Sequence, residues 1–260
     1  MKKSVFIAEK PSVAQEFAKA LKVKTTRHDG YLESENTIVT WCVGHLVTMS
    51  YPEVYDIKYK RWTLETLPFL PGEFKYEVIP AVRKQFEIVS GLLNRADVET
   101  IYVCTDSGRE GEYIYRLVAQ MAGVKGKKEK RVWIDSQTEE EIIRGIKEAK
   151  DLSAYNNLSA SAYLRAKEDY LMGINFSRIL TLRYGNSVSN YLGNKYQVIS
   201  VGRVMTCVLG MVVRREREIR EFVKTPFYRV LGKFSLEGRS FEGEWRAVEG
   251  SRILKFSSYL

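Results

Sequence analysis

Short apolar runs alternate with amphipathic stretches over the first 150 residues of the chain. Residues 4–8 and 100–104 are predominantly apolar and rich in β-branched side chains, which is typical of strands buried on both faces. A stretch with helical spacing follows each run, from about residue 11 and over 113–121. Strands that alternate with helices predict βαβ units, and hence an α/β fold with a mainly parallel sheet flanked by helices.

Other elements follow from the same pattern. We expect a strand over 37–47, a helix over 81–93, a strand over 131–134 and a helix that ends near 150. Pro11 suits the first turn of the first helix. Ser12 with Gln15, and Thr138 with Glu141, have the spacing of capping boxes.

The pattern changes beyond residue 150. Helical spacing runs to about residue 184 and resumes over 202–222 after a connection rich in Gly, Asn and Ser. Alternating residues over 227–245 predict antiparallel strands, and 252–256 predicts one more. Residues 51–74 lack a period and predict a long loop. The chain therefore divides into residues 1–150, 151–224 and 225–260.

Composition and charge narrow the classes of function. A hydrophobic content of 45% can bury a core, which excludes disorder for most of the chain. The net charge of +9 favours an anionic partner, such as nucleic acid or a phosphate-bearing surface. Three widely spaced cysteines without a CxxC pair predict neither disulfides nor a cysteine zinc site, and they fit a reducing cytoplasm. No run reaches the ~18 apolar residues of a membrane span, so we expect a cytoplasmic protein with no membrane contact.

Acidic residues stand where two predicted strands end. Glu9 and Lys10 follow the first strand, and Asp106 follows the strand over 100–104, with Glu110 and Glu112 shortly after it. Ligands of parallel sheets bind at the carboxyl ends of the strands. A carboxylate beside a lysine can hold a proton near a phosphate oxygen, and several carboxylates together suit Mg²⁺. The alternatives are a solvated Glu-Lys edge and glutamates that complement a helix dipole.

Seven motifs occur along the chain in a fixed order. They are FIAEKPSVAQ, TWCVGHL, YKRWTLETLPFLP, TDSGREGE, RVWIDSQTEEEI, DYLMGINFSR, and SVGRVMT followed by RREREIREF. In this order the chain resembles the type IA DNA topoisomerases, and most of all their topoisomerase III branch, from residue 4 to about 228. The resemblance implies a Toprim domain over 1–150, part of a helical domain that binds single-stranded DNA over 151–224, and the first strands of a β-rich arch domain over 225–260.

The resemblance also implies a Mg²⁺ site. In the family, the first-strand glutamate and a DxDxE run hold Mg²⁺ beside the scissile phosphate, and the adjacent lysine contacts that phosphate. By position these residues are Glu9, Lys10, Asp106 and Glu110. The second aspartate of the run is replaced by Gly108, which removes one carboxylate. We therefore expect weaker or rearranged metal binding, with Glu112 or water as a substitute ligand.

The later motifs imply contacts to single-stranded DNA. Arg165 and Asp169 match the family's RxxxD pair, although an i,i+4 ion pair on a helix face is the plain alternative. Asn175 and Arg178 match its GxNxTR pattern, for which packing between helices is the alternative. The full expected DNA-binding set is Arg109, Arg165, Asp169, Asn175, Arg178, Arg203 and Thr206. His45 of the GHL motif predicts a structural hydrogen-bonding residue, and the basic run over 125–131 predicts a solvated loop.

The family's nucleophile has no counterpart in the chain. Type IA enzymes cut one strand by attack of a tyrosine in an SYPRT-like motif, and Tyr51 in MSYP stands at the wrong place in the order of motifs. We therefore expect the tyrosine on the remaining domains of a longer chain, and a protein that binds single-stranded DNA and Mg²⁺ without relaxing DNA alone. Two other functions remain open: a Toprim nuclease or primase-type enzyme, and a non-catalytic DNA-binding module.

Overall fold

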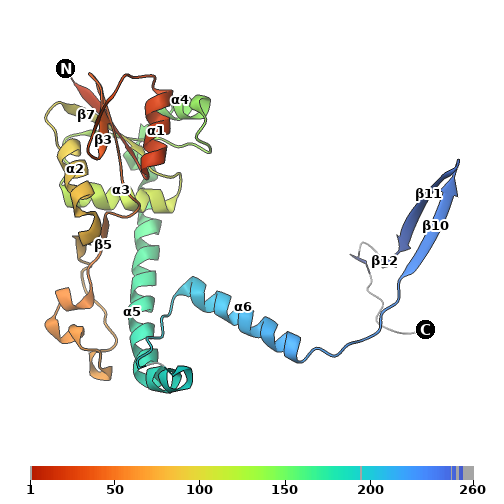
Figure 1. Ribbon diagram of the computed structural model, residues 1–260. Coiled ribbons are helices and arrows are strands. Elements are labelled where there is room, and N and C mark those ends of the chain that lie inside the picture. The colour runs from red at the N-terminus through yellow and green to blue at the C-terminus, as the bar shows by residue number, and fades with distance from the viewer. Residues whose placement is uncertain (1, 194, 247, 250–251, 254–260) are drawn as a thin grey trace. The chain divides into compact units, whose positions relative to one another are not determined.

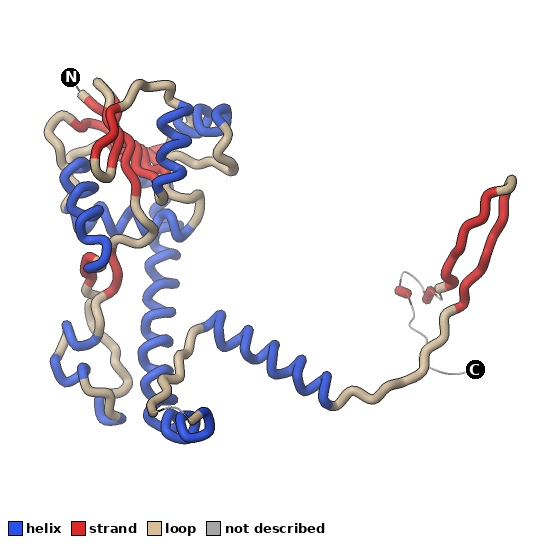
Figure 2. Tube along the Cα trace, viewed as in Figure 1, coloured by secondary structure: helices blue, strands red, loops and turns tan. Residues whose placement is uncertain are grey.

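The computed structural model of the protein describes residues 2–193, 195–246, 248–249 and 252–253. The chain divides into two compact units, Met1–Arg203 and Val204–Leu260, which are described separately below. Figures 1 and 2 show the helices and strands of both units.

A seven-stranded sheet forms the centre of the first unit (Figure 2). Its strands, in spatial order, are β2 (Thr26–His28), β3 (Tyr31–Glu33), β4 (Thr37–Trp41), β1 (Lys3–Ala8), β7 (Val98–Cys104), β8 (Lys128–Arg131) and β9 (Lys150–Asp151). Strand β1 pairs in parallel with β4 and β7, and β7 pairs in parallel with β8. The outer strands β2, β3 and β9 pair antiparallel. The predicted α/β fold with a mainly parallel central sheet is confirmed.

Helices cover both faces of this sheet (Figure 1). Helices α1 (Pro11–Ala20) and α4 (Glu139–Lys147) pack on one face, and α2 (Arg83–Leu93) and α3 (Arg109–Ala122) on the other. Successive side chains of a strand point to opposite faces, so Val5 and Ile7 of β1 enter the core under α2 and α3, whereas Phe6 and Ala8 enter the core under α1 and α4. Two covered faces explain why the strand is a continuous apolar run.

The segment expected as a long loop is irregular but anchored. Strands β5 (Val47–Met49) and β6 (Tyr76–Val78) pair at its base, and three 3₁₀ turns lie between them: η1 (Pro52–Val54), η2 (Ile57–Lys60) and η3 (Leu64–Thr66). Phe69 is 1% exposed, and its ring centroid lies 5.2 Å from that of Tyr55, 4.9 Å from Tyr59 and 6.3 Å from Tyr170. These contacts fix the segment against the helix that carries Tyr170.

That helix is α5 (Asn156–Leu192), which follows the 3₁₀ turn η5 (Leu152–Tyr155) and ends at Gly193, a residue with positive φ that serves as the C-cap. It packs on α3, where the rings of Tyr113 and Tyr163 lie 5.0 Å apart. Residues 151–203 therefore belong to the same compact unit as the sheet, and the domain boundary expected near residue 150 stays a prediction.

The second unit contains a helix and two short hairpins. Helix α6 spans Arg203–Arg220, starting at the last residue of the first unit, and strands β10 (Val230–Leu236) and β11 (Arg239–Trp245) pair antiparallel. Glu237 and Gly238 join them with positive φ at both residues, as a two-residue hairpin turn requires. Strands β12 (Val248–Glu249) and β13 (Arg252–Ile253) also pair, and the rest of the strand expected over 252–256 lies outside the described residues. Over the described part of the chain, no helix combines the length and apolarity needed to cross a membrane.

Both predicted capping boxes are wrong. Helix α1 begins at Pro11 after Lys10, so Ser12 lies inside the helix. Thr138 is the N-cap of α4, but its side chain makes no capping hydrogen bond. The Glu141 carboxylate instead accepts a hydrogen bond from the Asp135 N–H at 3.2 Å. The sequence spacing matched the motif, but the Glu141 carboxylate binds the Asp135 N–H and the guanidinium of Arg144 in α4 instead.

The basic run over 125–131 is not the solvated loop that we expected. Residues 128–131 form β8, and the strand expected over 131–134 therefore lies three residues earlier. Lys128 and Lys130 are exposed, whereas Arg131 is fully buried, which is the alternation of a strand. Lys127 donates two hydrogen bonds of 2.7 Å, to the carbonyls of Arg95 and Val98. The neighbouring β9 has only two residues, and lysines on such a poorly covered edge oppose pairing with other chains.

Candidate functional site

Glu9 and Asp106 meet at the carboxyl ends of β1 and β7. The two strands pair in parallel, with Ala8 opposite Cys104, so the residues that follow them emerge side by side. The Asp106 N–H donates a hydrogen bond to Glu9 Oε2 at 3.2 Å. Glu9 is only 8% exposed, whereas Asp106 and the adjacent Lys10 are exposed. The predicted neighbourhood of these two acids is therefore present in the structure.

The Glu9 carboxylate lies in an unfavourable electrostatic environment. Burial raises its pKa above the ordinary value, and the nearby Asp106 charge raises it further. The Asp106 N–H and the charges of Lys10 and His45 oppose this shift in part. A bound cation would relieve the repulsion between the two carboxylates. Mg²⁺ is usually held by one or two carboxylates together with water and substrate phosphate, so this pair fits it.

Glu9→Gln is expected to stabilise the protein near neutral pH. Because the folded state raises the Glu9 pKa, ionisation of Glu9 destabilises that state above the ordinary carboxyl pKa of 4.5, and this cost disappears below it. Urea unfolding of both proteins should therefore show a gain for the variant near neutral pH that shrinks as the pH falls toward 4.5 and is absent below it. The exposed glutamate Glu140 in α4 provides the control, Glu140→Gln, which should show no such gain. An equal gain in both variants would contradict the effect of burial.

The turn between β7 and α3 packs closely on the first turn of that helix. The Thr105 hydroxyl donates to the Gly111 carbonyl at 2.8 Å, and a Cβ added to Gly111 would lie 2.0 Å from the Asp106 carbonyl oxygen. Gly108 differs, because its backbone is extended and a Cβ there would meet nothing within 4 Å. The chain therefore requires glycine at position 111 but has room for a side chain at position 108.

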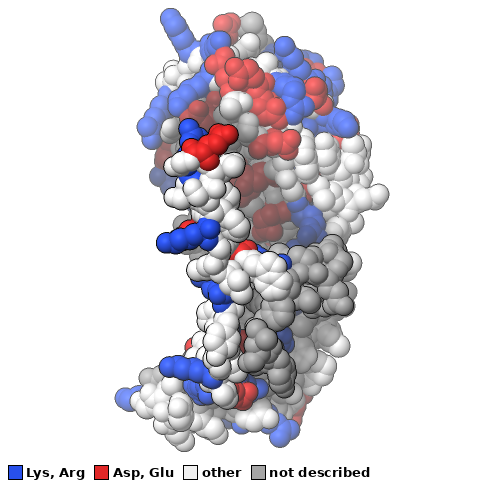
Figure 3. All heavy atoms as spheres, turned by 90° about the vertical axis from the view of Figure 1, so that its right-hand side faces the viewer, with Lys and Arg blue, Asp and Glu red and all other residues white. Residues whose placement is uncertain are grey.

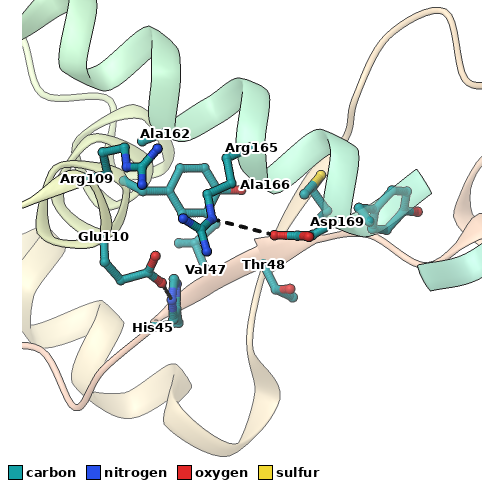
Figure 4. Close-up of a pocket in the computed structure, with 12 residues that line it drawn as sticks. His45, Val47, Thr48, Arg109, Glu110, Ala162, Arg165, Ala166 and Asp169 are labelled. Carbon is teal, nitrogen blue, oxygen red and sulfur yellow. Dashed lines mark hydrogen bonds and ion pairs between the residues drawn. The ribbon is translucent and has the colours of Figure 1, made fainter. Parts of the chain in front are cut away.

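A pocket of about 340 Å³ opens beside the start of α3 (Figure 4). Side chains from β5, α3 and α5 line it, together with His45 before β5. Glu110 Oε1 lies 2.6 Å from His45 Nε2, and Arg165 Nε lies 3.9 Å from Asp169 Oδ2. Two guanidinium groups at the pocket, those of Arg109 and Arg165, suit an anion such as a phosphate group. His45 has the hydrogen-bonding partner that we expected of it.

The four acids predicted as metal ligands do not gather at one point. Glu9 and Asp106 are neighbours, Glu110 is 68% exposed and bonded to His45, and Glu112 is fully buried in an ion pair with Arg131. Among the described residues, no group of three or more His, Cys, Asp or Glu side chains is arranged to hold a metal ion. Glu112 is therefore unavailable as the substitute ligand that we expected.

Two of the expected DNA-binding residues, Asn175 and Arg178, make contacts within the protein. The Asn175 amide accepts a hydrogen bond from the Phe69 N–H at 2.6 Å and donates one to the Phe69 carbonyl at 2.9 Å. Arg178 is 5% exposed, and its guanidinium lies 5.2 Å from the centre of the Trp62 ring. Both contacts fasten the segment 62–69 to α5, which favours the packing alternative over contact with DNA.

The remaining expected residues stay accessible. Arg203 forms ion pairs of 2.5 Å with both Glu168 and Asp169, a link between two motifs that the sequence did not suggest. Thr206 is exposed on α6. The sequence also missed Tyr113 and Tyr170, which line the same pocket beside the start of α3. No sequence motif marks these tyrosines, because an aromatic residue on a helix is equally typical of a packed core.

Comparison with known proteins identifies relatives for most of the chain. The Toprim domain model matches residues 4–136, and a DNA topoisomerase model matches residues 153–257. DNA topoisomerase 3 of Bacillus cereus (strain ATCC 14579) is 40% identical over 257 residues, and that of Shouchella clausii (strain KSM-K16) is 42% identical over 253 residues, each covering 97% of this chain. DNA topoisomerase 3 of Bacillus subtilis (strain 168) is 40% identical over 228 residues, or 88% of this chain.

The chain spans about a third of the length of these relatives, with 34%, 33% and 30% covered in the three proteins. The Toprim match ends at residue 136 and the second match begins at 153, which brackets the change of pattern near residue 150. The sheet, the paired acids at its carboxyl edge and the two matches agree with one another. The chain belongs to the type IA DNA topoisomerases, as a portion similar to topoisomerase III and carrying a Toprim domain.

Proposed function

We propose that this chain supplies the metal and phosphate site of a type IA DNA topoisomerase, which breaks and rejoins one DNA strand without ATP. The observation that carries the proposal is the hydrogen bond from the Asp106 N–H to Glu9 Oε2, which joins two acids at the ends of adjacent parallel strands. The nucleophilic tyrosine would come from the remaining part of a longer protein. Residues 1–150, 151–224 and 225–260 would serve as the Toprim domain, part of the helical domain and the first strands of the arch, in the cytoplasm.

The charge and exposure of each residue of the site suggest its role in the proposed function. Glu9 and Asp106 would hold Mg²⁺, which when bound neutralises charge at the scissile phosphate. Exposed Lys10 would contact the phosphate directly. The raised pKa of Glu9 reflects a carboxylate that is unfavourable beside Asp106 without a cation, so bound Mg²⁺ would stabilise its ionised form. Because the Asp106 side chain is exposed, some solvent water would remain at the proposed metal site.

The pocket beside α3 would bind the backbone of a single DNA strand. Arg109 and Arg165 line it from α3 and α5 and would contact phosphate groups of the strand. On the face in Figure 3, basic and acidic side chains are intermixed. Binding in the pocket would depend on these two arginines more than on a broad positive field, because Glu110 and Asp169 belong to the same lining.

Asp106→Asn is expected to lower the affinity for Mg²⁺ at least about tenfold, since it removes one of two ligand carboxylates. Gly108→Asp is expected to raise the affinity for Mg²⁺. Position 108 has room for a side chain, and an aspartate there restores the missing second aspartate of the DxDxE run. Titration calorimetry with MgCl₂, in the presence and absence of a short single-stranded oligonucleotide, measures both effects. Unchanged binding in Asp106→Asn would reject the proposed metal site.

A relaxation assay separates the proposal from its alternatives. The chain alone should bind single-stranded DNA and leave supercoiled plasmid unrelaxed. Mg²⁺-dependent nicking that is lost in Glu9→Gln would instead favour a Toprim nuclease. DNA binding that is indifferent to Mg²⁺ and to Glu9→Gln would favour a non-catalytic module.

A further inference from the structure

Two opposite charges, Glu112 and Arg131, are buried together between α3 and the end of β8. Neither side chain is exposed, and Arg131 Nε lies 2.7 Å from Glu112 Oε1. Burying two charges costs desolvation free energy that an apolar pair of similar size would avoid. The burial lowers the pKa of Arg131, and the Glu112 charge opposes this shift. Stability alone is therefore a poor reason for placing this pair here.

Three of the four hydrogen bonds of Arg131 go to the end of β7 and the turn that carries the acidic site, and the fourth runs from its Nη1 to the Val132 carbonyl at 3.2 Å. Its Nη1 donates to the carbonyls of Val103 at 3.0 Å and Thr105 at 2.7 Å, and its Nη2 donates to the carbonyl of Asp106 at 2.6 Å. The N–H of the same Asp106 donates to the Glu9 carboxylate. The buried Arg131 guanidinium is thus hydrogen-bonded both to the end of β7 and to Asp106, the residue that contacts Glu9.

Glu112 holds the guanidinium in place from the opposite side. Its second oxygen, Oε2, lies 3.2 Å from Arg116 Nε, and Arg116 Nη2 donates to the Leu152 carbonyl at 2.8 Å. The ring of Trp133 lies 5.4 Å from the Arg131 guanidinium carbon. Arg131 Nε makes no hydrogen bond to Glu112, so the Glu112 carboxylate acts on the guanidinium as a buried counterion 2.7 Å away.

We propose that the Glu112–Arg131 pair is the positioning device of the acidic site, and that it holds the Asp106 turn where Asp106 and Glu9 face one cation. The proposal rests on the proposed function of these two acids as metal ligands. Neither member of the pair touches the metal. Glu112 acts through Arg131 as its counterion, and it does not replace the carboxylate missing at position 108.

The test compares the 260-residue wild-type chain with Arg131→Met, Glu112→Gln and the double variant Glu112→Leu/Arg131→Met. The double variant removes both charges and fills the space with apolar side chains, so its thermal midpoint should recover most of what Arg131→Met loses. It cannot restore the bonds to the three carbonyls. We expect its dissociation constant for Mg²⁺, from calorimetry with MgCl₂, to remain about 10- to 100-fold above that of the wild type.

A second readout does not depend on metal. Hydrogen exchange followed by NMR should show faster exchange of the Asp106 amide in the double variant, while amides of α1 keep their protection. Leu93→Ala, a core truncation in α2 at the far end of β7, is the control for lost stability. It should lower the thermal midpoint and leave both the Mg²⁺ affinity and the Asp106 exchange unchanged.

The outcomes separate the two proposals. Recovery of Mg²⁺ affinity and Asp106 protection together with stability in the double variant would overturn the positioning role. Loss of Mg²⁺ affinity in Leu93→Ala equal to that in the double variant would overturn it as well. If Asp106→Asn leaves Mg²⁺ binding unchanged, the proposed metal site fails, and the Asp106 exchange rate then decides by itself whether the pair holds the turn.

Discussion

Gly111→Ala is expected to lower the free energy of unfolding by about 3 kcal/mol or more, which would be among the largest effects of adding one methyl group to this protein. The added Cβ would lie 2.0 Å from the Asp106 carbonyl oxygen and 2.9 Å from the Asp106 nitrogen. Both atoms are backbone, so neither can rotate away. Relief requires a shift of the turn or of α3, and either shift moves Asp106. Urea unfolding measures the loss, and calorimetry with MgCl₂ measures the accompanying loss of metal affinity.

The matched control is Gly108→Ala, three residues earlier in the same turn. A Cβ at position 108 meets nothing within 4 Å, and the backbone there is extended. We expect the free energy of unfolding to change by less than about 1 kcal/mol, since the entropy lost by the unfolded chain offsets the weaker N-cap. Equal losses at both positions would mean that the close approach at Gly111 does not exist in solution.

Phe69→Ala is expected to cost about 3–5 kcal/mol, the usual range for truncating a fully buried phenylalanine. Phe69 is the centre of a cluster with Tyr55, Tyr59 and Tyr170, and it attaches the segment 51–74 to α5. Because the cluster is peripheral to the sheet, the segment should detach before the sheet unfolds. Fluorescence of Trp62, which lies in that segment, should therefore change at a lower urea concentration than circular dichroism does.

Leu70→Ala supplies the comparison one position away. Leu70 is 67% exposed, so its truncation should change the free energy of unfolding by less than about 1 kcal/mol and leave the two transitions coincident. If Leu70→Ala separates the transitions as far as Phe69→Ala does, the segment is not held by the buried ring.

Elements buried on both faces were the most predictable part of the fold. The runs around Val5 and Ile101 read as strands because a parallel sheet covered on both sides needs apolar residues at every position. Strand β8, which lies next to the two-residue edge strand β9, was not predictable, because only Arg131 among its residues is buried. An arginine in a lysine-rich stretch gives no sign that it turns inward, and its partner Glu112 lies 19 positions earlier on another element.

The site divides in the same way. The pairing of Glu9 with Asp106 was predictable, since the carboxyl ends of neighbouring parallel strands share an edge. The roles of Asn175 and Arg178 were not, because a polar side chain on α5 can face a ligand or another segment of the chain. Which of these occurs depends on the path of residues 62–69, and that path has no periodic pattern to reveal it.

The pairing of β1 with β7 has a consequence during synthesis. Strand β1 leaves the ribosome before β7, one of its two neighbours in the sheet, which begins at Val98, and Glu9 and Asp106 are 97 positions apart. At a synthesis rate of about 5–20 residues per second, Asp106 is added to the chain roughly 5–20 s after Glu9. Until β7 is synthesised, the backbone edge of β1 that will pair with β7 is exposed to other chains. The nascent chain therefore passes through an interval in which a chaperone can bind β1 and in which the metal site cannot yet form.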